Sequence, residues 1–380
     1  MNPKPINLLI VGNFSFDVGY AWNTIMEYFM HLGEVFADRG GTATLCVPGS
    51  AEVPEKIRGS RIKVEQFDFG GVGLLELVDY LRKREIRIVY LTDRPVYSFR
   101  YLACRFAGVR RIVVHDRTSG ERDVPGFLKG AIKSIIARYP LASADRAVAI
   151  SNYVSRRLET VSRFPKSRIV RIWNGVNVKR FAPGADDFVF ERFGIPKDRK
   201  VVFCYSRANR YKGIEVLIDA AEALVHGQNR KDAFFLFCGD GPDLEAFRSR
   251  VREKNLSEHF ICPGKSDRVD RILKGSTAVV VPPLWQEGFG LSVIEGMACG
   301  KVVLASRVGG IVDIITDAED GFLFPPGDSG NLALLLSGVL DDRPLREKMG
   351  TAARLTVIGR FNIEDKKREL SRLFLELAWQ

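Results

Sequence analysis

The 380-residue chain lacks several features that define other classes of protein. No apolar run reaches the roughly 18 residues that a membrane-spanning helix needs, and the opening "MNPKPINLLIVG" lacks the long apolar core and cleavage site of a signal peptide. The six cysteines stand singly and the four histidines have no close spacing, which argues against a disulfide framework and a zinc site. We therefore expect a cytoplasmic protein with reduced, buried thiols and no metal ion.

Nucleotide- and nucleic-acid-binding fingerprints are also missing. No G-x-G-x-x-G follows the first expected strand, and neither GKS nor GKT occurs anywhere, which counts against hydride transfer and against P-loop ATP hydrolysis. There is no zinc-finger spacing and no RRM signature, so only charge would support a nucleic-acid partner, and we do not expect one.

Charge is unevenly distributed along the chain. Residues 1–180 hold 29 Lys and Arg against 17 Asp and Glu, a net charge of +12, whereas residues 181–380 hold 28 against 29, a net charge of −1. The basic half is expected to meet something anionic, such as nucleic acid, an acidic polymer or a membrane surface. A basic surface without a partner is the alternative.

Short β-branched runs alternate with amphipathic segments through most of the chain, which predicts an α/β protein with parallel sheets covered by helices on both faces. This alternation begins again after a polar stretch, 185–200. We therefore expect two doubly wound, Rossmann-like domains, 1–180 and 181–362, with the ligand site in the cleft between them. The expected strands are 6–12, 43–48, 86–92, 111–116 and 146–151 in the first domain, and 201–206, 234–241, 277–283 and 301–306 in the second.

The stretch "LWQEGFGLSVIEGMACG" (284–300) places two glutamates eight positions apart. Glu295 is the only charged residue between Gly288 and Gly300, and the apolar residues around it have the spacing of a core-facing helical stripe. Glu287 lies in a glycine-containing loop, where the backbone can approach a ligand closely. The helix that follows would begin with the N–H groups of Gly290 and Leu291. Both carboxylates could face one cleft. The alternative is a pair of solvated glutamates.

Polar residues also follow three other expected strands. Arg207 comes just after 201–206, with Lys212 five residues further on before a helix, and two such cations suit a pyrophosphate. His115 lies at the end of the expected strand 111–116, where ligands meet such sheets. Solvent-facing cations and a structural histidine are the alternatives. Gly19, after the first strand, could bring an N–H group to a phosphate.

The segment "ERDVPGFLKGAIKSIIARYP" (121–140) is expected to form a two-faced helix. Its apolar face would carry Phe127, Leu128, Ala131, Ile132, Ile135 and Ile136, and the opposite face Lys129, Lys133 and Arg138. Such a helix could rest on an anionic membrane surface, or it could be an ordinary helix packed on its own sheet.

Seven motifs, in order, resemble glycosyltransferase family 4, the retaining nucleotide-sugar-dependent glycosyltransferases of the GT-B fold. They are "ADRAVAISNYVSRRL", "NGVNVKRFAPG", "SRANRYKG", "CGDGPDLE", "PPLWQEGFGLSVIEGMACGKVVLASRVGGIVDII", "GFLFPPGD" and "RFNIED". The resemblance implies transfer of a hexose-type sugar from a UDP or GDP sugar to a saccharide or lipid-linked glycan, in envelope polysaccharide or glycolipid synthesis. It implies no cofactor and no metal, in agreement with the absence of an Asp-x-Asp triplet. It also implies that the final helix, 363–380, packs back on the first domain.

The resemblance assigns a role to each candidate residue. Glu295 would bind the ribose hydroxyls, Glu287 would lie at the donor sugar, and Arg207 and Lys212 would hold the diphosphate. His115 would touch the donor sugar, so Glu287, His115, Arg207 and Lys212 form the catalytic set. The other donor-binding candidates are Gly19, Gly264, Lys265, Gly288, Phe289, Gly290 and Leu291.

Two departures from the family pattern stand out. Val18-Gly19 replaces two adjacent glycines, and "YSR" replaces the common Gly-Arg pair while keeping Arg207. Two alternative functions stay open: a GT-B nucleotide-sugar epimerase without a separate acceptor, and a non-catalytic carbohydrate- or nucleic-acid-binding protein on the same fold. The basic first domain would place a transferase at the inner face of the membrane.

Overall fold

The computed structural model describes residues 5–13, 16, 21–49 and 52–379. The chain divides into two compact units. The first comprises residues up to Thr118, Arg122–Trp173 and residues from Glu364 onward, and the second comprises Ser119–Glu121 and Asn174–Ile363.

The division between the units lies at 173/174, whereas the sequence-based boundary was 180/181. Hydrogen bonds explain the difference. Arg354 donates to the carbonyl oxygens of Val178 at 2.9 Å and Phe181 at 2.7 Å, so the segment before residue 181 is tied to the second unit.

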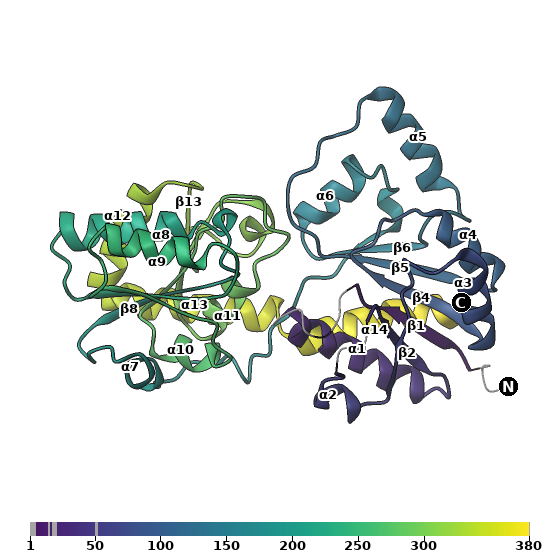
Figure 1. Ribbon diagram of the computed structural model, residues 1–380, viewed down its shortest axis with the longest axis horizontal. Helices are drawn as coiled ribbons and strands as arrows, with labels where there is room; N and C mark the ends of the chain where they lie inside the picture. Colours follow the sequence, from purple (N-terminus) through teal and green to yellow (C-terminus); the bar gives the residue numbers. More distant parts are fainter. Residues whose placement is uncertain (1–4, 14–15, 17–20, 50–51, 380) are drawn as a thin grey trace. The chain divides into compact units, whose positions relative to one another are not determined.

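The first unit is built on a seven-stranded parallel sheet with the order β3-β2-β1-β4-β5-β6-β7 (Figure 1). The step from β1 to β4 at its centre is the strand-order reversal of a doubly wound sheet. Its strands are β1 (Asn7–Val11), β2 (Ala43–Val47), β3 (Ile62–Gln66), β4 (Ile86–Thr92), β5 (Arg111–Asp116), β6 (Arg146–Ala149) and β7 (Ile169–Arg171). Its helices are α1 (Ala21–Ala37), α2 (Glu55–Arg58), α3 (Leu74–Lys83), α4 (Phe99–Phe106), α5 (Phe127–Arg138), α6 (Asn152–Thr160), η1 (Lys166–Arg168) and α14 (Ile363–Trp379).

The second unit is built on a six-stranded parallel sheet with the order β10-β9-β8-β11-β12-β13. Its strands are β8 (Lys200–Tyr205), β9 (Ala233–Cys238), β10 (Phe260–Gly264), β11 (Ala278–Val281), β12 (Val302–Ser306) and β13 (Phe322–Phe324). Its helices are α7 (Phe188–Phe193), η2 (Arg210–Lys212), α8 (Ile214–Glu222), η3 (Ala223–Gly227), α9 (Leu244–Glu253), α10 (Val269–Gly275), α11 (Leu291–Ala298), η4 (Gly309–Asp313), α12 (Ser329–Asp341) and α13 (Arg343–Arg360).

These two parallel sheets confirm the predicted fold class, and each of the nine predicted strands is present. The four strands that the sequence analysis did not find are β3, β7, β10 and β13, which are the edges of the two sheets. Edge strands are short or alternate with exposed side chains, as in "IKVEQ" of β3, so they lack the continuous apolar run that marks a central parallel strand.

The helix predicted over 121–140 is present as α5, but the interpretation in which its apolar face packs on the sheet is wrong. Phe127 is 94% exposed and Ile135 is 71% exposed, and only Gly130 and Ala137 of this helix are buried. Among the residues that the structure describes, no helix is both long and apolar enough to cross a membrane.

The last helix, α14, packs in the core of the first unit. Phe374 is fully buried, and its ring lies 5.1 Å from that of Tyr90 and 6.4 Å from that of Phe36, both edge-on. Tyr90 is in the central strand β4, so α14 covers the middle of the sheet.

Replacing this aromatic anchor is expected to destabilise the first unit. Phe374→Ala should lower the free energy of unfolding by about 3–5 kcal/mol, because it removes buried apolar area and leaves a cavity between two other rings. Urea unfolding measures the loss. Glu376→Ala, an exposed position on the same helix, is the control. A loss no greater than that of the control would contradict this packing.

Candidate active site

The predicted donor-binding cations of the second unit lie in loops at one edge of its sheet. Strands β8, β9 and β11 are parallel neighbours, so their carboxyl ends open on the same edge. Arg207 lies two residues beyond the end of β8, and Lys212 ends the short helix η2. Lys265 follows β10, which pairs with β9. The structure therefore brings these three cations to one edge.

A close backbone contact positions the loop that carries Lys212. Gly213 has φ +72°, and a Cβ atom there would lie 1.7 Å from the carbonyl oxygen of Pro282. Only glycine fits, because a side chain would displace the backbone that follows β11. The loops after β8 and β11 thus touch directly, and this contact brings Lys212 to Glu287.

Lys212 and Glu287 form an ion pair, with Nζ of Lys212 bonded to Oε1 of Glu287. The two side chains are only 19% and 12% exposed. Because removing a charge from water is costly, each needs the other in this position. Ser119 completes the contact: its hydroxyl accepts a hydrogen bond from the Gly288 N–H at 2.9 Å and donates to Oε2 of Glu287 at 3.4 Å.

The backbone of Glu287 is held from the other side by the loop after β12. Gly309 has φ +50°, and a Cβ atom there would lie 2.1 Å from the carbonyl oxygen of Glu287. The neighbouring Gly310 donates its N–H to that same oxygen at 2.8 Å. The two glycines of "RVGG" therefore have a positioning role: they allow one backbone to lie directly against another and so support the carboxylate.

Arg207 differs from Lys212 in its surroundings. Its side chain is exposed, and its guanidinium forms no hydrogen bond or ion pair with any residue that the structure describes. The assignment of both cations to the diphosphate stays a prediction, and the structure adds that Lys212 also pairs with Glu287. An ammonium group carries three donors, so Lys212 can keep this bond and still bind a phosphate oxygen.

Glu295 lies in α11, and the helix is largely covered by protein, as its sequence pattern predicted. Val293, Ile294 and Met297 are buried, whereas Glu295 keeps a minor part of its surface accessible. Tyr205, the last residue of β8, donates a hydrogen bond from its hydroxyl to Oε2 of Glu295 at 2.6 Å. This bond ties the second carboxyl group to the strand that leads into the Arg207 loop.

Burial raises the pKa of Glu295 to about 7. The hydrogen bond from Tyr205 and the positive charge of Arg180 both favour the ionised carboxylate, but they do not offset the loss of water around it. Glu295 is therefore a carboxyl group whose charge changes near neutral pH. A ligand hydroxyl that donates to it would favour the charged form.

No side chain of the described residues caps the amino end of α11, which follows Gly290 with φ +122°. The first N–H groups of a helix have no partner within it, and those of Leu291 and Ser292 bond to no other described residue. The other two predicted backbone donors differ. The N–H of Gly288 is used by Ser119, and Phe289 is 3% exposed, with its ring 5.6 Å from that of Phe361. The open donors at this position are thus at the helix end itself.

Gly264 ends β10 beside the turn that follows β9. Its carbonyl oxygen accepts a hydrogen bond from the Gly239 N–H at 3.0 Å. A Cβ atom on Gly239 would lie 2.0 Å from the carbonyl oxygen of Ser206, and one on Gly241 would lie 2.5 Å from that of Ala208. The glycines of "CGDG" therefore pack the turn against the Arg207 loop.

His115 lies in the first unit, at the end of β5, and its ring is buried. Burial and the charge of Arg117 hold the pKa of His115 well below its ordinary value, so the imidazole is neutral. Its Nδ1 lies 2.5 Å from the Tyr90 hydroxyl and 3.4 Å from an Arg117 nitrogen, two donors that favour the proton on Nε2. That Nε2 is buried without a hydrogen-bond partner among the described residues.

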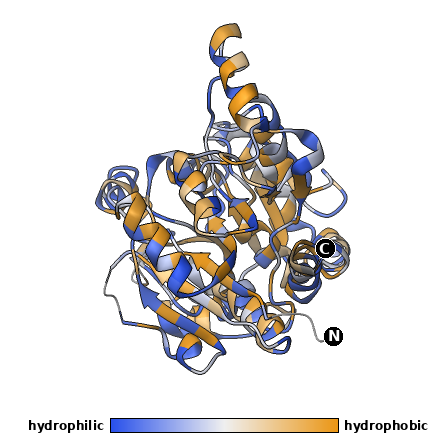
Figure 2. Ribbon diagram, turned by 90° about the vertical axis from the view of Figure 1, so that its right-hand side faces the viewer, coloured by the Kyte–Doolittle hydropathy of each residue, from blue (hydrophilic) through white to orange (hydrophobic). Residues whose placement is uncertain are grey.

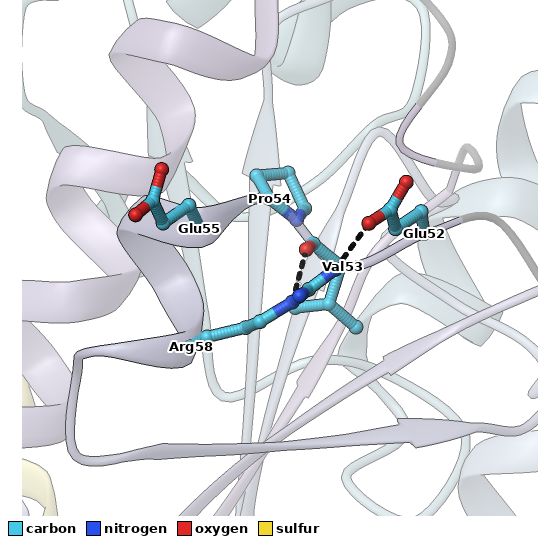
Figure 3. A pocket seen from close by; sticks show the side chains of 5 residues that line it. All are labelled: Glu52, Val53, Pro54, Glu55 and Arg58. Atoms are coloured by element: carbon cyan, nitrogen blue, oxygen red, sulfur yellow. Dashed lines mark hydrogen bonds and ion pairs between the residues drawn. The ribbon is translucent and has the colours of Figure 1, made fainter.

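The predicted phosphate contact of Gly19 lies outside the described residues, so it stays a prediction. No group of three or more His, Cys, Asp or Glu in the described part of the chain could hold a metal ion. A surface hollow in the first unit, lined by Glu52–Glu55 and Arg58, contains none of the candidate residues, and Arg58 bonds within it to Glu52 and to the Val53 carbonyl (Figure 3).

Sequence reasoning missed three residues of the site: Ser119, Tyr205 and Gly309. Ser119 lies in the quoted "RIVVHDRTSG" and Tyr205 in "VVFCYSR", but neither motif indicates what the side chain touches. A double glycine, as in "RVGG", was the one local signal for a close backbone approach.

Two family models match the chain side by side. The model described as Glycosyltransferase Family 4 matches residues 27–180, and the one described as Glycosyl transferases group 1 matches residues 186–356. The chain belongs to glycosyltransferase family 4. The ordered motifs of the second unit, which carried the resemblance, lie largely within the second match.

The curated relatives of this family 4 protein are matched over part of their length. The N-acetyl-alpha-D-glucosaminyl L-malate synthase of Bacillus anthracis is 25% identical over 70% of this chain and 68% of its own length. The D-inositol 3-phosphate glycosyltransferase of Corynebacterium diphtheriae is 31% identical over 47% of this chain, so that the chain spans less than half (44%) of that relative.

Solved structures share the fold over the whole chain. The glycosyltransferase of Rickettsia africae has a TM-score of 0.83 at 20% identity and covers 100% of both chains. The Anabaena protein HepE in complex with UDP and glucose has a TM-score of 0.78 at 18% identity, covering 97% of this chain and 99% of that chain. These likenesses place the family 4 chain in the GT-B fold.

Glu295→Gln is expected to remove a pH dependence of stability. The pKa of about 7 in the folded protein exceeds the ordinary 4.5, so the folded state binds more protons than the unfolded state between these values. The free energy of unfolding therefore falls as pH rises through this window, by an amount on the order of 3 kcal/mol. Urea unfolding without nucleotide at about pH 5 and about pH 8 should show this loss in the wild type only. Equal pH dependence in both proteins would contradict the burial of the carboxyl group.

Proposed function

We propose that the protein is a retaining glycosyltransferase that moves a sugar from a nucleoside diphosphate sugar to a saccharide or lipid-linked glycan. The observation that carries the proposal is the grouping at one sheet edge of the Lys212–Glu287 ion pair, Arg207 and the largely buried Glu295. Such a group offers cations to a diphosphate and carboxylates to sugar hydroxyls. Membership of family 4 and the UDP bound to the Anabaena structure support this donor class.

Glu295 is suited to the ribose of the donor. An ionised carboxylate has acceptor sites beyond the one that Tyr205 uses, and a ribose offers two adjacent hydroxyl donors. These hydrogen bonds would favour the charged form and so lower the raised pKa of Glu295. The isolation of this carboxyl group in an otherwise neutral helix follows from this role, since the ligand replaces the water that burial removes.

Arg207 and Lys212 are suited to the diphosphate. The guanidinium of Arg207 has no partner within the described part of the chain, and Lys212 has further donors besides the one directed to Glu287. The uncapped amino end of α11 adds backbone N–H groups with the positive end of the helix dipole. Charge on the leaving nucleoside diphosphate grows as its bond to the sugar breaks, so these donors bind more strongly in the transition state and need no metal.

In the proposed reaction, the bond between the anomeric carbon and the phosphate oxygen breaks, and an acceptor hydroxyl oxygen bonds to that carbon. The hydroxyl proton passes to the departing phosphate, so the products are the glycosylated acceptor and a nucleoside diphosphate. Attack on the face from which the phosphate leaves retains the anomeric configuration. Glu287 orients the donor sugar. For His115, in the first unit, contact with the donor sugar stays a prediction from the family resemblance.

The setting of the reaction follows from the basic first unit. Envelope polysaccharide or glycolipid synthesis at the inner face of the membrane would use a lipid-linked acceptor and a cytoplasmic UDP or GDP sugar.

A panel of nucleotide sugars tested by thermal shift identifies the donor, because a ligand of the native state raises the melting temperature. Turnover that needs no acceptor would instead indicate an epimerase.

Arg207→Ala is expected to weaken binding of UDP or GDP roughly tenfold to a hundredfold, because charge-assisted hydrogen bonds contribute about 1.5–3 kcal/mol. Isothermal titration calorimetry measures the affinity. Arg210→Ala is the matched control, since Arg210 is exposed in the same loop and its guanidinium lies near Asp243 and Glu215. Equal affinities of the two variants would remove Arg207 from the diphosphate site.

Glu287→Gln is expected to lower turnover by roughly a hundredfold or more, because the donor sugar loses a charged group that orients it. The affinity for the nucleoside diphosphate should change little, since Glu287 is not placed at the diphosphate. Glu319→Gln, an exposed position in the same unit, is the control. Wild-type turnover in the Glu287 variant would contradict the proposed role and favour a protein that only binds carbohydrate.

A further inference from the structure

Helix α5 presents its faces in the reverse of the usual order for a helix of a soluble protein. Such helices normally turn their apolar stripe to the core and their polar stripe to water. In α5 the residues that face the protein are small or charged: Gly130 and Ala137 are buried, and Nζ of Lys133 donates to the carbonyl oxygen of Val161 at 3.0 Å. The apolar side chains point away from the unit.

The helix is nevertheless anchored to its unit. Arg168 donates from its guanidinium to the carbonyl oxygen of Ala137, and a Cβ atom on Gly130 would lie 3.4 Å from the Arg163 guanidinium. These contacts hold the orientation of α5, so its outward apolar face is a property of the folded unit.

Large apolar side chains are exposed on α5 and on the residues just before and after it, and we call this set the α5 surface. It consists of Val124, Phe127, Leu128, Ile132, Ile135, Ile136, Tyr139 and Leu141. These are eight of the eighteen large hydrophobic side chains exposed on the described residues, gathered in a small fraction of the chain. Figure 2 shows α5 at the top of the view, with the colour of hydrophobic residues over much of the helix. Contiguous apolar surfaces of this kind mark interaction sites.

The charged residues within the α5 surface are of one sign. Lys129 and Arg138 are exposed on the helix, and no Asp or Glu occurs between Val124 and Leu141, whereas the exposed residues just before it, Glu121, Arg122 and Asp123, carry both signs. Apolar side chains interspersed only with cations match the boundary between acyl chains and anionic headgroups. An acidic partner protein would match the cations but would leave the large aliphatic side chains without a counterpart.

We propose that the α5 surface binds an anionic lipid bilayer, with its apolar side chains in the headgroup region and the flanking cations on lipid phosphates. The proposal deepens the proposed function and rests on it, because it states where the transferase meets a lipid-linked acceptor. A second copy of the chain is a poorer partner. A two-fold contact through α5 would bring Lys129 and Arg138 of one copy toward the same pair of cations on the other, and like charges repel at an interface.

Vesicle flotation tests the proposal with the full chain. The wild type should float with vesicles of phosphatidylcholine and phosphatidylglycerol, should bind phosphatidylcholine vesicles far less, and should release as ionic strength rises. Phe127→Ser/Ile135→Ser should lower the vesicle partition coefficient roughly tenfold or more, because it removes two of the most exposed apolar side chains. Leu334→Ser/Leu355→Ser, at positions 69% and 64% exposed in the second unit, is the matched control and should bind as the wild type does.

A charge variant tests the second part of the surface. Lys129→Glu should weaken binding to the anionic vesicles several-fold at low salt, whereas Lys348→Glu, exposed on α13, should not. Equal binding by the apolar double variant and its control would overturn the proposal. Concentration-dependent dimerisation in analytical ultracentrifugation, lost in Phe127→Ser/Ile135→Ser, together with no vesicle binding, would also overturn it in favour of a second copy.

The readouts separate this proposal from the proposed function. Binding of UDP or GDP to the α5 variants, measured without vesicles, should equal that of the wild type, because no donor-site residue is changed. Vesicle binding by a protein that turns over no nucleotide sugar would support the α5 surface while contradicting the transferase.

Discussion

The site of the second unit depends on direct contact between backbones at one edge of a parallel sheet. Only glycine, which has no Cβ atom, allows so close a contact. Gly213 lies against the carbonyl of Pro282, and Gly309 lies against the carbonyl of Glu287, each at a separation that any side chain would prevent. Loops from different strands are thereby held at fixed positions, and the Lys212–Glu287 ion pair forms where they meet. The rest of the proposed chemistry builds on that rigidity.

Burial of charged groups at this edge costs free energy in the protein without a ligand, because the groups lose water. A bound ligand that pairs with them would offset that cost. Lys212 and Glu287 offset each other's loss of water. Glu295 accepts one side-chain hydrogen bond from the described residues, from the Tyr205 hydroxyl, and its pKa is near neutral. In the proposed function, a nucleoside diphosphate sugar would supply what is missing, with hydroxyls for the carboxyl group and anionic oxygens for the exposed Arg207. Sites prepared in this way stabilise charge without reorganising during the reaction.

Most of the fold could be predicted from the alternation of apolar strands and amphipathic helices, because central parallel strands are buried on both faces and their sequences show it. Edge strands such as β3 and β13 were not predicted. Each pairs with only one neighbouring strand and lacks the continuous apolar run of a central strand. Helix α5 shows a different limit. Its two faces could be read from the sequence, but periodicity does not state which face meets the protein. Packing against Arg163 and Arg168 decides that.

The sequence by itself determined the parallel α/β architecture, the pair of glutamates in one motif, and the cations that follow β8, because each depends on residue order alone. The tertiary structure decided which of these groups are paired. It joined Ser119 to Glu287, Tyr205 to Glu295, and Lys212 rather than Arg207 to a carboxylate. Those partners are 75 to 168 residues apart along the chain, and only the folding of the sheet brings them within hydrogen-bond distance.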